Sequence, residues 1–178
     1  LELEKFSPFA PLHQPHNLNG VRTLQKLFPD VPQYGCFDTA FHADHDALHS
    51  SFALPKYLND IGLKRYGFHG LSYDWISRQA KADKMVVAHL GSGASLCALL
   101  IGKSIDSTMG LTALDGLPMS TRSGSVYAGL ILYLSKNLSY SAEKIEHILY
   151  SESGLKGLSG ISGDFKTLLS SDDMSAKF

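Results

Sequence analysis

The stretch from residue 85 to residue 104 is the feature that most constrains the fold of this chain. An apolar run at 85–90 ends at Gly91-Ser92-Gly93, and apolar character resumes at 95–101 before a second turn at Gly102-Lys103. Short apolar runs bounded by glycine are typical of strands, so we predict a β-hairpin here. Glycine lets the turn approach a ligand closely, and the exposed N–H groups of such a turn favour an anion, typically phosphate. An ordinary tight hairpin is the alternative, because Gly-x-Gly alone is a weak signal.

Strand-like and helix-like segments alternate along the rest of the chain. Helices are predicted at 16–28, 72–82, 127–136 and 142–151, and a short one begins at Asp164. Further strands are predicted at 31–37, 63–68 and 104–107, with an irregular glycine-rich stretch at 109–124. The alternation indicates an α/β protein. The hairpin adds antiparallel pairing, which predicts a mixed sheet flanked by helices.

Composition excludes several classes of function. With 44% hydrophobic and 19% charged residues, the chain has the balance of a globular protein. Its 16 basic and 17 acidic residues are dispersed, so no basic patch predicts nucleic-acid binding. Cys36 and Cys97 form no disulfide framework, and the sequence shows neither a signal peptide nor an apolar run long enough to cross a membrane. We therefore expect a cytoplasmic protein that binds neither nucleic acid nor membranes.

Polar residues recur just after the apolar segments. Asp38 follows the apolar run at 31–37, His69 follows 65–68, and His89 lies near the end of the first hairpin arm. Ligands of α/β proteins gather beyond the carboxyl ends of strands, so these are candidate site residues. Arg122 lies in a Ser/Gly-rich loop, where a fixed guanidinium can hold a phosphoryl or carboxylate group. Such a set fits phosphoryl transfer, whose chemistry is mostly positioning and charge neutralisation.

Each candidate also has a purely structural explanation. Asp38 could cap the residues that follow it, His69 before Gly70 could be a turn histidine, and Arg122 could bond loop carbonyls. A metal site is the alternative for three histidines of one segment, His42, His45 and His49. A solvated loop is the preferred interpretation of this polar segment.

Seven motifs occur together in one order, and the combination is far more specific than its parts. They are Ala10-Pro11-Leu12-His13, Phe37-Asp38-Thr39-Ala40-Phe41-His42, Arg65-Tyr66-Gly67-Phe68-His69-Gly70, Ala88-His89-Leu90-Gly91-Ser92-Gly93-Ala94-Ser95, Met109-Gly110-Leu111-Thr112, Thr121-Arg122-Ser123-Gly124 and Gly160-Ile161-Ser162-Gly163-Asp164. This series resembles the acetate/propionate kinase (acetokinase) family, which transfers phosphate between ATP and a short-chain carboxylate. The resemblance covers nearly the whole chain, but only the central part of a full-length member.

The resemblance implies an incomplete actin-like, or sugar-kinase, fold, which is built from two ribonuclease-H-like lobes with the active site in the cleft. Residues 1–30 would end the N-terminal lobe, and residues 31–178 would form the central part, mostly a truncated C-terminal lobe. The implied cofactors are ATP/ADP and Mg²⁺, with the metal ligands in segments outside this chain. The implied partners are acetate or propionate and the acyl phosphate, and the full-length protein would be a homodimer.

The resemblance also implies roles for individual residues. Asp38 would be the active-site carboxylate, and His69 and Arg122 would stabilise the transferring phosphoryl group. The nucleotide would be bound by His89, Leu90, Gly91, Ser92, Gly93, Asp164, Phe165 and Lys166. The small acyl pocket would be lined by Leu12, His13, Phe68 and Ala113.

The substrate class decides what Asp38 would do. A carboxylate substrate is already a nucleophile at neutral pH and needs no general base, so Asp38 is expected to orient groups or to act on the metal. If Asp38 were a base, a hydroxyl or water substrate would be implied instead. A sugar-kinase-like phosphotransferase or ATPase is therefore the alternative enzyme.

The sequence departs from the family pattern at several of these motifs. Ser92 replaces the usual Asn of the phosphate turn, and Leu71 and Tyr73 replace a Thr and a His. Ala113 replaces a Pro beside the acyl pocket, which would favour propionate or larger acids, and Lys166 replaces an Arg.

Several family motifs are not found in these residues. They are the opening phosphate hairpin, a substrate-binding Arg motif and the C-terminal nucleotide loop with its metal-linked Glu. We therefore expect the 178-residue chain alone to be inactive or very weak. The alternative to an enzyme is a structural fragment that retains partial nucleotide binding.

Overall fold

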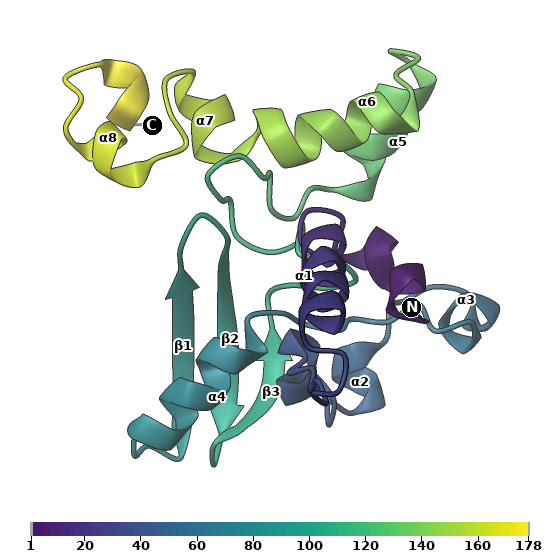
Figure 1. The fold of residues 1–178 in the computed structure, drawn as a ribbon. Helices are drawn as coiled ribbons and strands as arrows, with labels where there is room; N and C mark the ends of the chain where they lie inside the picture. Colours follow the sequence, from purple (N-terminus) through teal and green to yellow (C-terminus); the bar gives the residue numbers. More distant parts are fainter. Residues whose placement is uncertain (1, 178) are drawn as a thin grey trace.

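A computed structural model describes residues 2–177 of the chain (Figure 1). The sheet of this part has three antiparallel strands in the order β1-β2-β3. They are β1 (Lys84–Leu90), β2 (Ala94–Leu100) and β3 (Lys103–Ser107). Leu90 pairs with Ala94 across the Gly91-Ser92-Gly93 turn, which confirms the predicted hairpin.

The helices lie on one side of the sheet and beyond its end. The α-helices are α1 (Gln14–Leu27), α2 (Ala47–Ser50), α3 (Lys56–Asp60), α4 (Gly70–Gln79), α5 (Ala128–Lys136), α6 (Ala142–His147), α7 (Gly154–Ser159) and α8 (Phe165–Leu169). Three 3-10 helices, η1 (Glu2–Phe9), η2 (Asp38–His42) and η4 (Met174–Lys177), and a π-helical turn η3 (Ile148–Glu152) complete the described chain. Figure 1 shows α5 to α8 beyond the end of the sheet that carries the β1–β2 turn. None of the described helices is long and apolar enough to span a bilayer.

Two small apolar cores hold these elements together. The first core joins α4 to the sheet and consists of Tyr73, Val87, Cys97 and Leu99. The second lies where the hairpin meets the irregular stretch after β3 and consists of Ala94, Met109, Ala113 and Met119. Because burial of apolar surface is the main stabilising term, the second core fixes the loop at 109–124 against the turn end of the hairpin.

The strands predicted at 31–37 and 63–68 are wrong. Residues 31–37 are exposed rather than buried, and they pair with no strand of the described chain. At 63–68, Arg65 N donates to the Ser50 carbonyl at the end of α2 and Tyr66 N donates to the Gly110 carbonyl, so neither joins a sheet ladder. The apolar pattern marked extended segments correctly, but strand formation also needs a partner edge. The described sheet is therefore wholly antiparallel rather than mixed.

The predicted helices are correct in type but not always in their bounds. The helix predicted from residue 72 begins at Gly70, and its N-cap is His69. Ser141 caps α6 through Lys144 N and Asp164 caps α8 through Thr167 N, as the sequence predicts. Helix α7 was missed, because its glycines and serines are typical of a loop.

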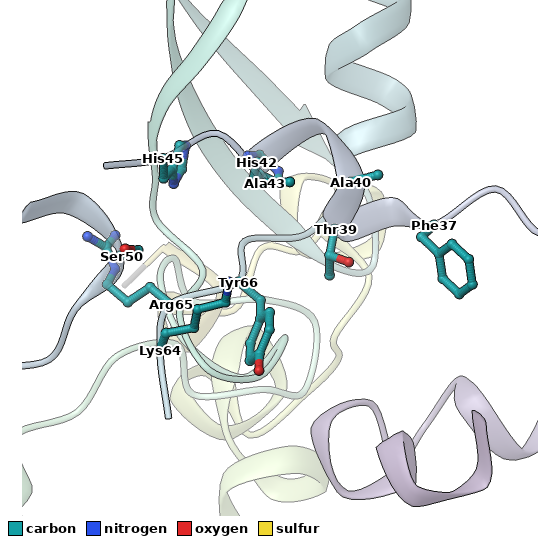
Figure 2. A pocket seen from close by; sticks show the side chains of 10 residues that line it. All are labelled: Phe37, Thr39, Ala40, His42, Ala43, His45, Ser50, Lys64, Arg65 and Tyr66. Carbon is teal, nitrogen blue, oxygen red and sulfur yellow. The ribbon is translucent and has the colours of Figure 1, made fainter. Parts of the chain in front are cut away.

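A buried polar network joins η2 to β3. The Ser104 hydroxyl lies 2.8 Å from His42 Nδ1 and 2.7 Å from His45 Nε2, while His42 Nε2 donates to the Phe68 carbonyl at 2.9 Å. Burial lowers the pKa of His42, which keeps its ring neutral at pH 7. Beside it, a cavity of about 230 Å³ opens between η2 and Arg65 (Figure 2). The described residues contain no group of three or more His, Cys, Asp or Glu that could hold a metal ion.

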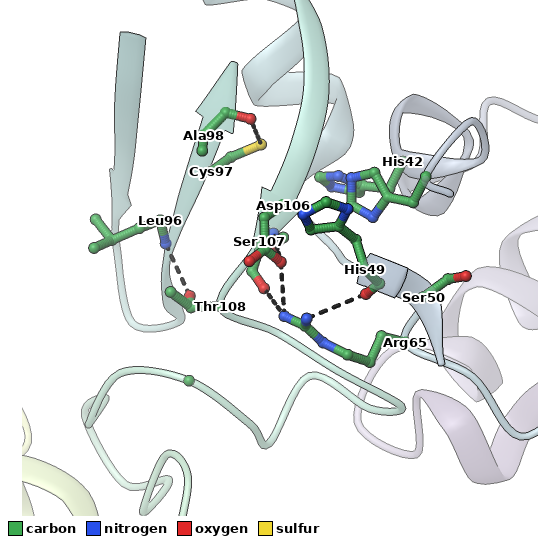
Figure 3. A network of polar contacts seen from close by, with 12 residues as sticks. His42, His49, Ser50, Arg65, Leu96, Cys97, Ala98, Asp106, Ser107 and Thr108 are labelled. Atoms are coloured by element: carbon green, nitrogen blue, oxygen red, sulfur yellow. Dashed lines mark hydrogen bonds and ion pairs between the residues drawn. The ribbon is translucent and has the colours of Figure 1, made fainter. Parts of the chain in front are cut away.

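The neighbouring network around Arg65 leaves one hydroxyl unpaired. Figure 3 shows the Arg65 guanidinium reaching Asp106, the Ser107 carbonyl and the His49 carbonyl. The Ser107 hydroxyl is buried and has no hydrogen-bond partner among residues 2–177. An unpaired buried hydroxyl costs free energy, so it is a site where alanine fits better.

We expect Ser107→Ala to leave the free energy of unfolding unchanged or to raise it by up to about 1 kcal/mol. Ser104→Ala is the matched control, and it should cost about 1–3 kcal/mol because it removes the hydroxyl that bonds Nδ1 of the buried His42 and Nε2 of the half-buried His45. Urea unfolding of the three proteins measures both effects. A loss in Ser107→Ala as large as that in Ser104→Ala would contradict this explanation.

Candidate functional site

Arg122 is the buried cation of the site, and hydrogen bonds hold its loop in place. Met119 N donates to the Arg122 carbonyl at 3.0 Å, and Leu155 N at the start of α7 donates to the Met119 carbonyl at 2.8 Å. The guanidinium is anchored by Nη1, which donates to the Ala113 carbonyl at 2.6 Å. Only 7% of the residue is exposed. Packing and backbone bonds therefore fix where this positive charge lies.

The charge of Arg122 has no counter-ion within the described chain. No carboxylate of residues 2–177 forms an ion pair with it. Burial lowers the pKa of the guanidinium, although an arginine in a protein remains protonated. A buried charge without a partner is expensive. The arrangement is therefore suited to an anionic ligand.

The hairpin turn between β1 and β2 lies against the Arg122 guanidinium. A Cβ on Gly93 would lie 2.5 Å from Arg122 Nη2 and 3.3 Å from His69 Nε2, so a larger residue would displace both groups. Ser120 N donates to the Ser92 carbonyl at 3.2 Å, which links the arginine loop to the turn. The turn, the guanidinium and the imidazole thus meet at one point.

Asp38 and His69 are brought together by the start of α4. One Asp38 carboxylate oxygen accepts from His69 N and the other accepts from Leu71 N at 3.2 Å. Asp38 therefore caps α4 from a distant segment, whereas the sequence suggested a cap of the residues that follow it. His69 adopts φ 58°, a left-handed conformation that is uncommon for a residue other than glycine. Asp38 is thus placed to hold this strained turn.

The His69 ring is neutral at physiological pH. Its Nδ1 lies 2.8 Å from the Ser95 hydroxyl, and its face stacks on His89 with ring centroids 4.0 Å apart. The pKa of His69 is lowered to about 4, mainly by burial and also by the charges of His89 and Arg122, while Asp38 acts in the opposite direction. His69 is therefore suited to act as an uncharged hydrogen-bonding group.

This pKa predicts how stability depends on pH. Because the folded-state pKa of about 4 lies below the ordinary value of 6.5, the unfolded chain binds the proton more readily between these values. Stability should therefore fall as the pH drops from 6.5 towards 4, and His69 should contribute to this loss.

Urea unfolding at pH 5 and pH 7.5 measures this dependence, and His69→Asn should reduce it. His42 and His45, whose pKa values burial also lowers, add a change of the same sign that persists in the variant. An equal dependence in the variant and the unaltered protein would contradict the assignment to His69.

A cavity of about 620 Å³ extends from the hairpin turn to the start of α8. It is lined by Leu90, Gly91 and Ser92 of the turn region and by Asp164 and Phe165. The structure thus brings five predicted nucleotide-binding residues, far apart in the sequence, to one cavity. Of the other three, His89 stacks on His69 and Gly93 lies under Arg122. Lys166 is exposed and does not line the cavity.

Of the four residues predicted for the acyl pocket, two lie in an apolar core, one lies near His69 and one is exposed. Phe68 packs against the core that contains Ala113, so these two lie together beside Arg122. His13 is close enough to His69 for its charge to lower the pKa of that ring. Leu12 lies just before α1, is 47% exposed and does not belong to the residues that pack against this core. The structure therefore brings Phe68 and Ala113 together beside Arg122, and it places His13 near His69.

Two residues in contact with the site were not singled out from the sequence. Ser95, fully buried on β2, bonds His69, and Tyr73 on α4 bonds Ser95. The register that pairs His89 with Ser95 is the signal that could have identified the serine.

Comparison with known proteins places this geometry in a family. The sequence model of the acetokinase family matches residues 1–177. The acetate kinase of Rhodopseudomonas palustris is 53% identical over 180 residues, covering 97% of this chain and 45% of that protein. The acetate kinase of Nitrobacter hamburgensis is 50% identical over 182 residues, covering 98% of this chain and 45% of that protein. The chain thus spans about half the length of the curated relatives that it matches.

Solved structures agree with the sequence comparison. A propionate kinase from Francisella tularensis superposes with a TM-score of 0.92 at 38% identity, covering 98% of this chain and 48% of that one. The acetate kinase of Porphyromonas gingivalis superposes with a TM-score of 0.87 at 36% identity, covering 98% of this chain and 47% of that one. The α/β arrangement with its small antiparallel sheet is that of an incomplete actin-like fold, as predicted. The chain belongs to the acetokinase family.

Proposed function

We propose that these residues form part of the active site of a kinase that transfers phosphate between ATP and a short-chain carboxylate, acetate or propionate, giving an acyl phosphate and ADP. The observation that carries the proposal is the buried, unpaired Arg122 guanidinium, which meets the neutral His69 ring over Gly93. This is the arrangement that a transferring phosphoryl group needs, because such a group carries spread negative charge and forms few covalent bonds to the protein.

Each group has one role in the proposed transfer. A carboxylate oxygen of the substrate attacks the terminal phosphorus in line, and the bond from phosphorus to the bridging oxygen of ADP breaks. Arg122 neutralises charge on the equatorial oxygens, and His69 donates a hydrogen bond to one of them. Asp38 holds the backbone of His69 rather than removing a proton, because the substrate is already ionised. The transfer therefore needs no general base.

The residues present fit the nucleotide better than they fit its metal. The 620 Å³ cavity joins the hairpin turn to Phe165, whose exposed ring can contact a base, and we propose that ATP/ADP occupies it. Bound Mg²⁺ would supply further charge neutralisation on the phosphates. Because the described residues contain no group of three or more potential metal ligands, no step is assigned to this chain through the metal.

The proposal extends to the acyl end of the site and to the assembly of the whole protein. Ala113 is a small residue in the core beside Phe68, so we propose that the pocket admits propionate as well as acetate. From the resemblance we also propose that residues 1–30 end one lobe and residues 31–178 belong mostly to the next. The whole protein is proposed to be a cytoplasmic homodimer, and its mass in solution would test the dimer.

A chimera tests the proposed activity. In it, the matched region of the R. palustris relative is replaced by the present 178 residues, and acyl phosphate formation is measured with acetate and propionate. We expect ATP-dependent turnover within about tenfold of the unaltered relative. The 178-residue chain on its own is expected to be inactive or nearly so. A folded chimera that phosphorylates neither acid would contradict the proposal, and transfer to a sugar hydroxyl would favour the sugar-kinase alternative.

A further inference from the structure

The Ser95 hydroxyl stands between two side chains at the centre of the site. It lies 2.8 Å from His69 Nδ1, and it also bonds the Tyr73 hydroxyl. Ser95 and Tyr73 are both fully buried, so water does not complete their hydrogen bonds. The direction of each bond can therefore be worked out from donors and acceptors alone.

Tyr73 is the donor in its bond to Ser95. Burial raises the pKa of the phenol, so Tyr73 carries its proton at neutral pH. Within residues 2–177 this proton is accepted by the Ser95 hydroxyl oxygen. If Ser95 donated to Tyr73 instead, the phenol proton would be buried without a partner, which is costly.

Ser95 in turn donates to His69. The serine has one proton, and its two partners are Tyr73, which donates to it, and His69 Nδ1. The nitrogen must then accept, because a proton on Nδ1 would leave the serine proton without an acceptor. A neutral histidine that accepts at Nδ1 carries its own proton on Nε2.

Nε2 is the atom of His69 that faces the candidate phosphate site. It lies near the position that a Gly93 Cβ would take, as does Arg122 Nη2. We propose that Tyr73 and Ser95 are positioning residues that fix His69 in the Nε2–H tautomer, so that a neutral ring donates to the transferring phosphoryl group. The part concerning the phosphoryl group rests on the proposed function, whereas the tautomer does not.

The tautomer can be measured without any activity. In the purified protein labelled with ¹⁵N-histidine, long-range ¹H–¹⁵N correlation spectra distinguish protonated from bare ring nitrogens, and His69→Gln identifies the His69 signals. We expect Nε2 of His69 to be protonated and Nδ1 to be bare. Ser95→Ala should give a mixture of the two His69 tautomers. Tyr66→Phe is the control: it removes a phenol bonded to the Gly62 carbonyl and should leave the single His69 tautomer unchanged. A proton on Nδ1 in the unaltered protein would overturn the proposal.

A double-mutant cycle in the chimera tests the catalytic consequence. Ser95→Ala and Tyr73→Phe should each lower kcat by about tenfold or more, with KM for ATP nearly unchanged. The glutamine of His69→Gln places an amide donor near the Nε2 position and has no tautomer to fix. Ser95→Ala should therefore cost far less in that background. Additive effects would show that Ser95 has a merely structural role and would overturn the proposal.

The two experiments separate the possible failures. An inactive chimera that shows the Nε2–H tautomer contradicts the proposed kinase function and leaves the positioning of His69 standing. An active chimera that shows a proton on Nδ1 contradicts the positioning role and leaves the kinase function standing.

Discussion

Replacing Arg122 with alanine in the chimera is expected to lower kcat by about 10³-fold or more. Removing a preorganised cation from a phosphoryl-transfer site typically has an effect of this size. The guanidinium is buried and anchored on the Ala113 carbonyl, so no other described cation can take its place. Because the interaction forms mainly with the transferring group, KM for ATP should change much less than kcat.

The stability of the same variant distinguishes catalysis from folding. Arg122 has no ion-pair partner in the described chain, so its removal relieves the cost of a buried charge and should not lower the free energy of unfolding appreciably. Arg78→Ala, which breaks an exposed ion pair with Asp74 on α4, is the matched control and should leave kcat unchanged. A variant without Arg122 that keeps kcat within about tenfold would contradict its proposed role.

Gly93→Ala is expected to lower kcat by about 10²-fold, because the added methyl group displaces the side chains of Arg122 and His69. The new methyl group would lie 2.5 Å from Arg122 Nη2 and 3.3 Å from His69 Nε2, so both side chains must move. Displacements of about 1 Å in a preorganised site are enough for a loss of this size. Steady-state kinetics of the chimera measure the effect, and circular dichroism shows whether the hairpin is retained.

Gly91→Ala in the same turn is the matched control. Its Cβ would lie 3.3 Å from the Gly93 carbonyl oxygen and 3.6 Å from His89 Nε2, which small shifts can relieve. We expect a loss of kcat well below that of Gly93→Ala. Equal losses in the two variants would show that the turn is merely sensitive to substitution, and that Gly93 has no special relation to Arg122.

The sequence predicted the hairpin because its apolar runs and glycine turn are local signals. The prediction that its turn meets distant residues rested on strand ends, two of which are absent from the described sheet, and on the family resemblance. Glycines at 91 and 93 bound two apolar runs, and the pairing of Leu90 with Ala94 confirms the strand ends. Asp38, His69 and Arg122 each follow an apolar segment or lie in a Ser/Gly loop, and the structure brings His69 into contact with Asp38 and places it with Arg122 over Gly93. Their catalytic roles remain proposals.

Features that depend on a tertiary partner could not be predicted from local pattern. Residues 31–37 have the composition of a strand, but no described edge pairs with them. The role of Tyr73 could not be predicted either, because nothing in the sequence reveals that its hydroxyl meets Ser95 on β2. Asp38 caps a helix 32 residues further along the chain, and only the folded backbone shows this.

The most direct test of the central claim is a crystal structure of the chimera with a non-hydrolysable ATP analogue. The terminal phosphate should lie over Gly93, within hydrogen-bond distance of the Arg122 guanidinium and of His69 Nε2. The base should lie in the cavity beside Phe165. A nucleotide bound elsewhere, with the Arg122 guanidinium still bonded only to the Ala113 carbonyl, would contradict the proposal that this hairpin and its arginine bind phosphate.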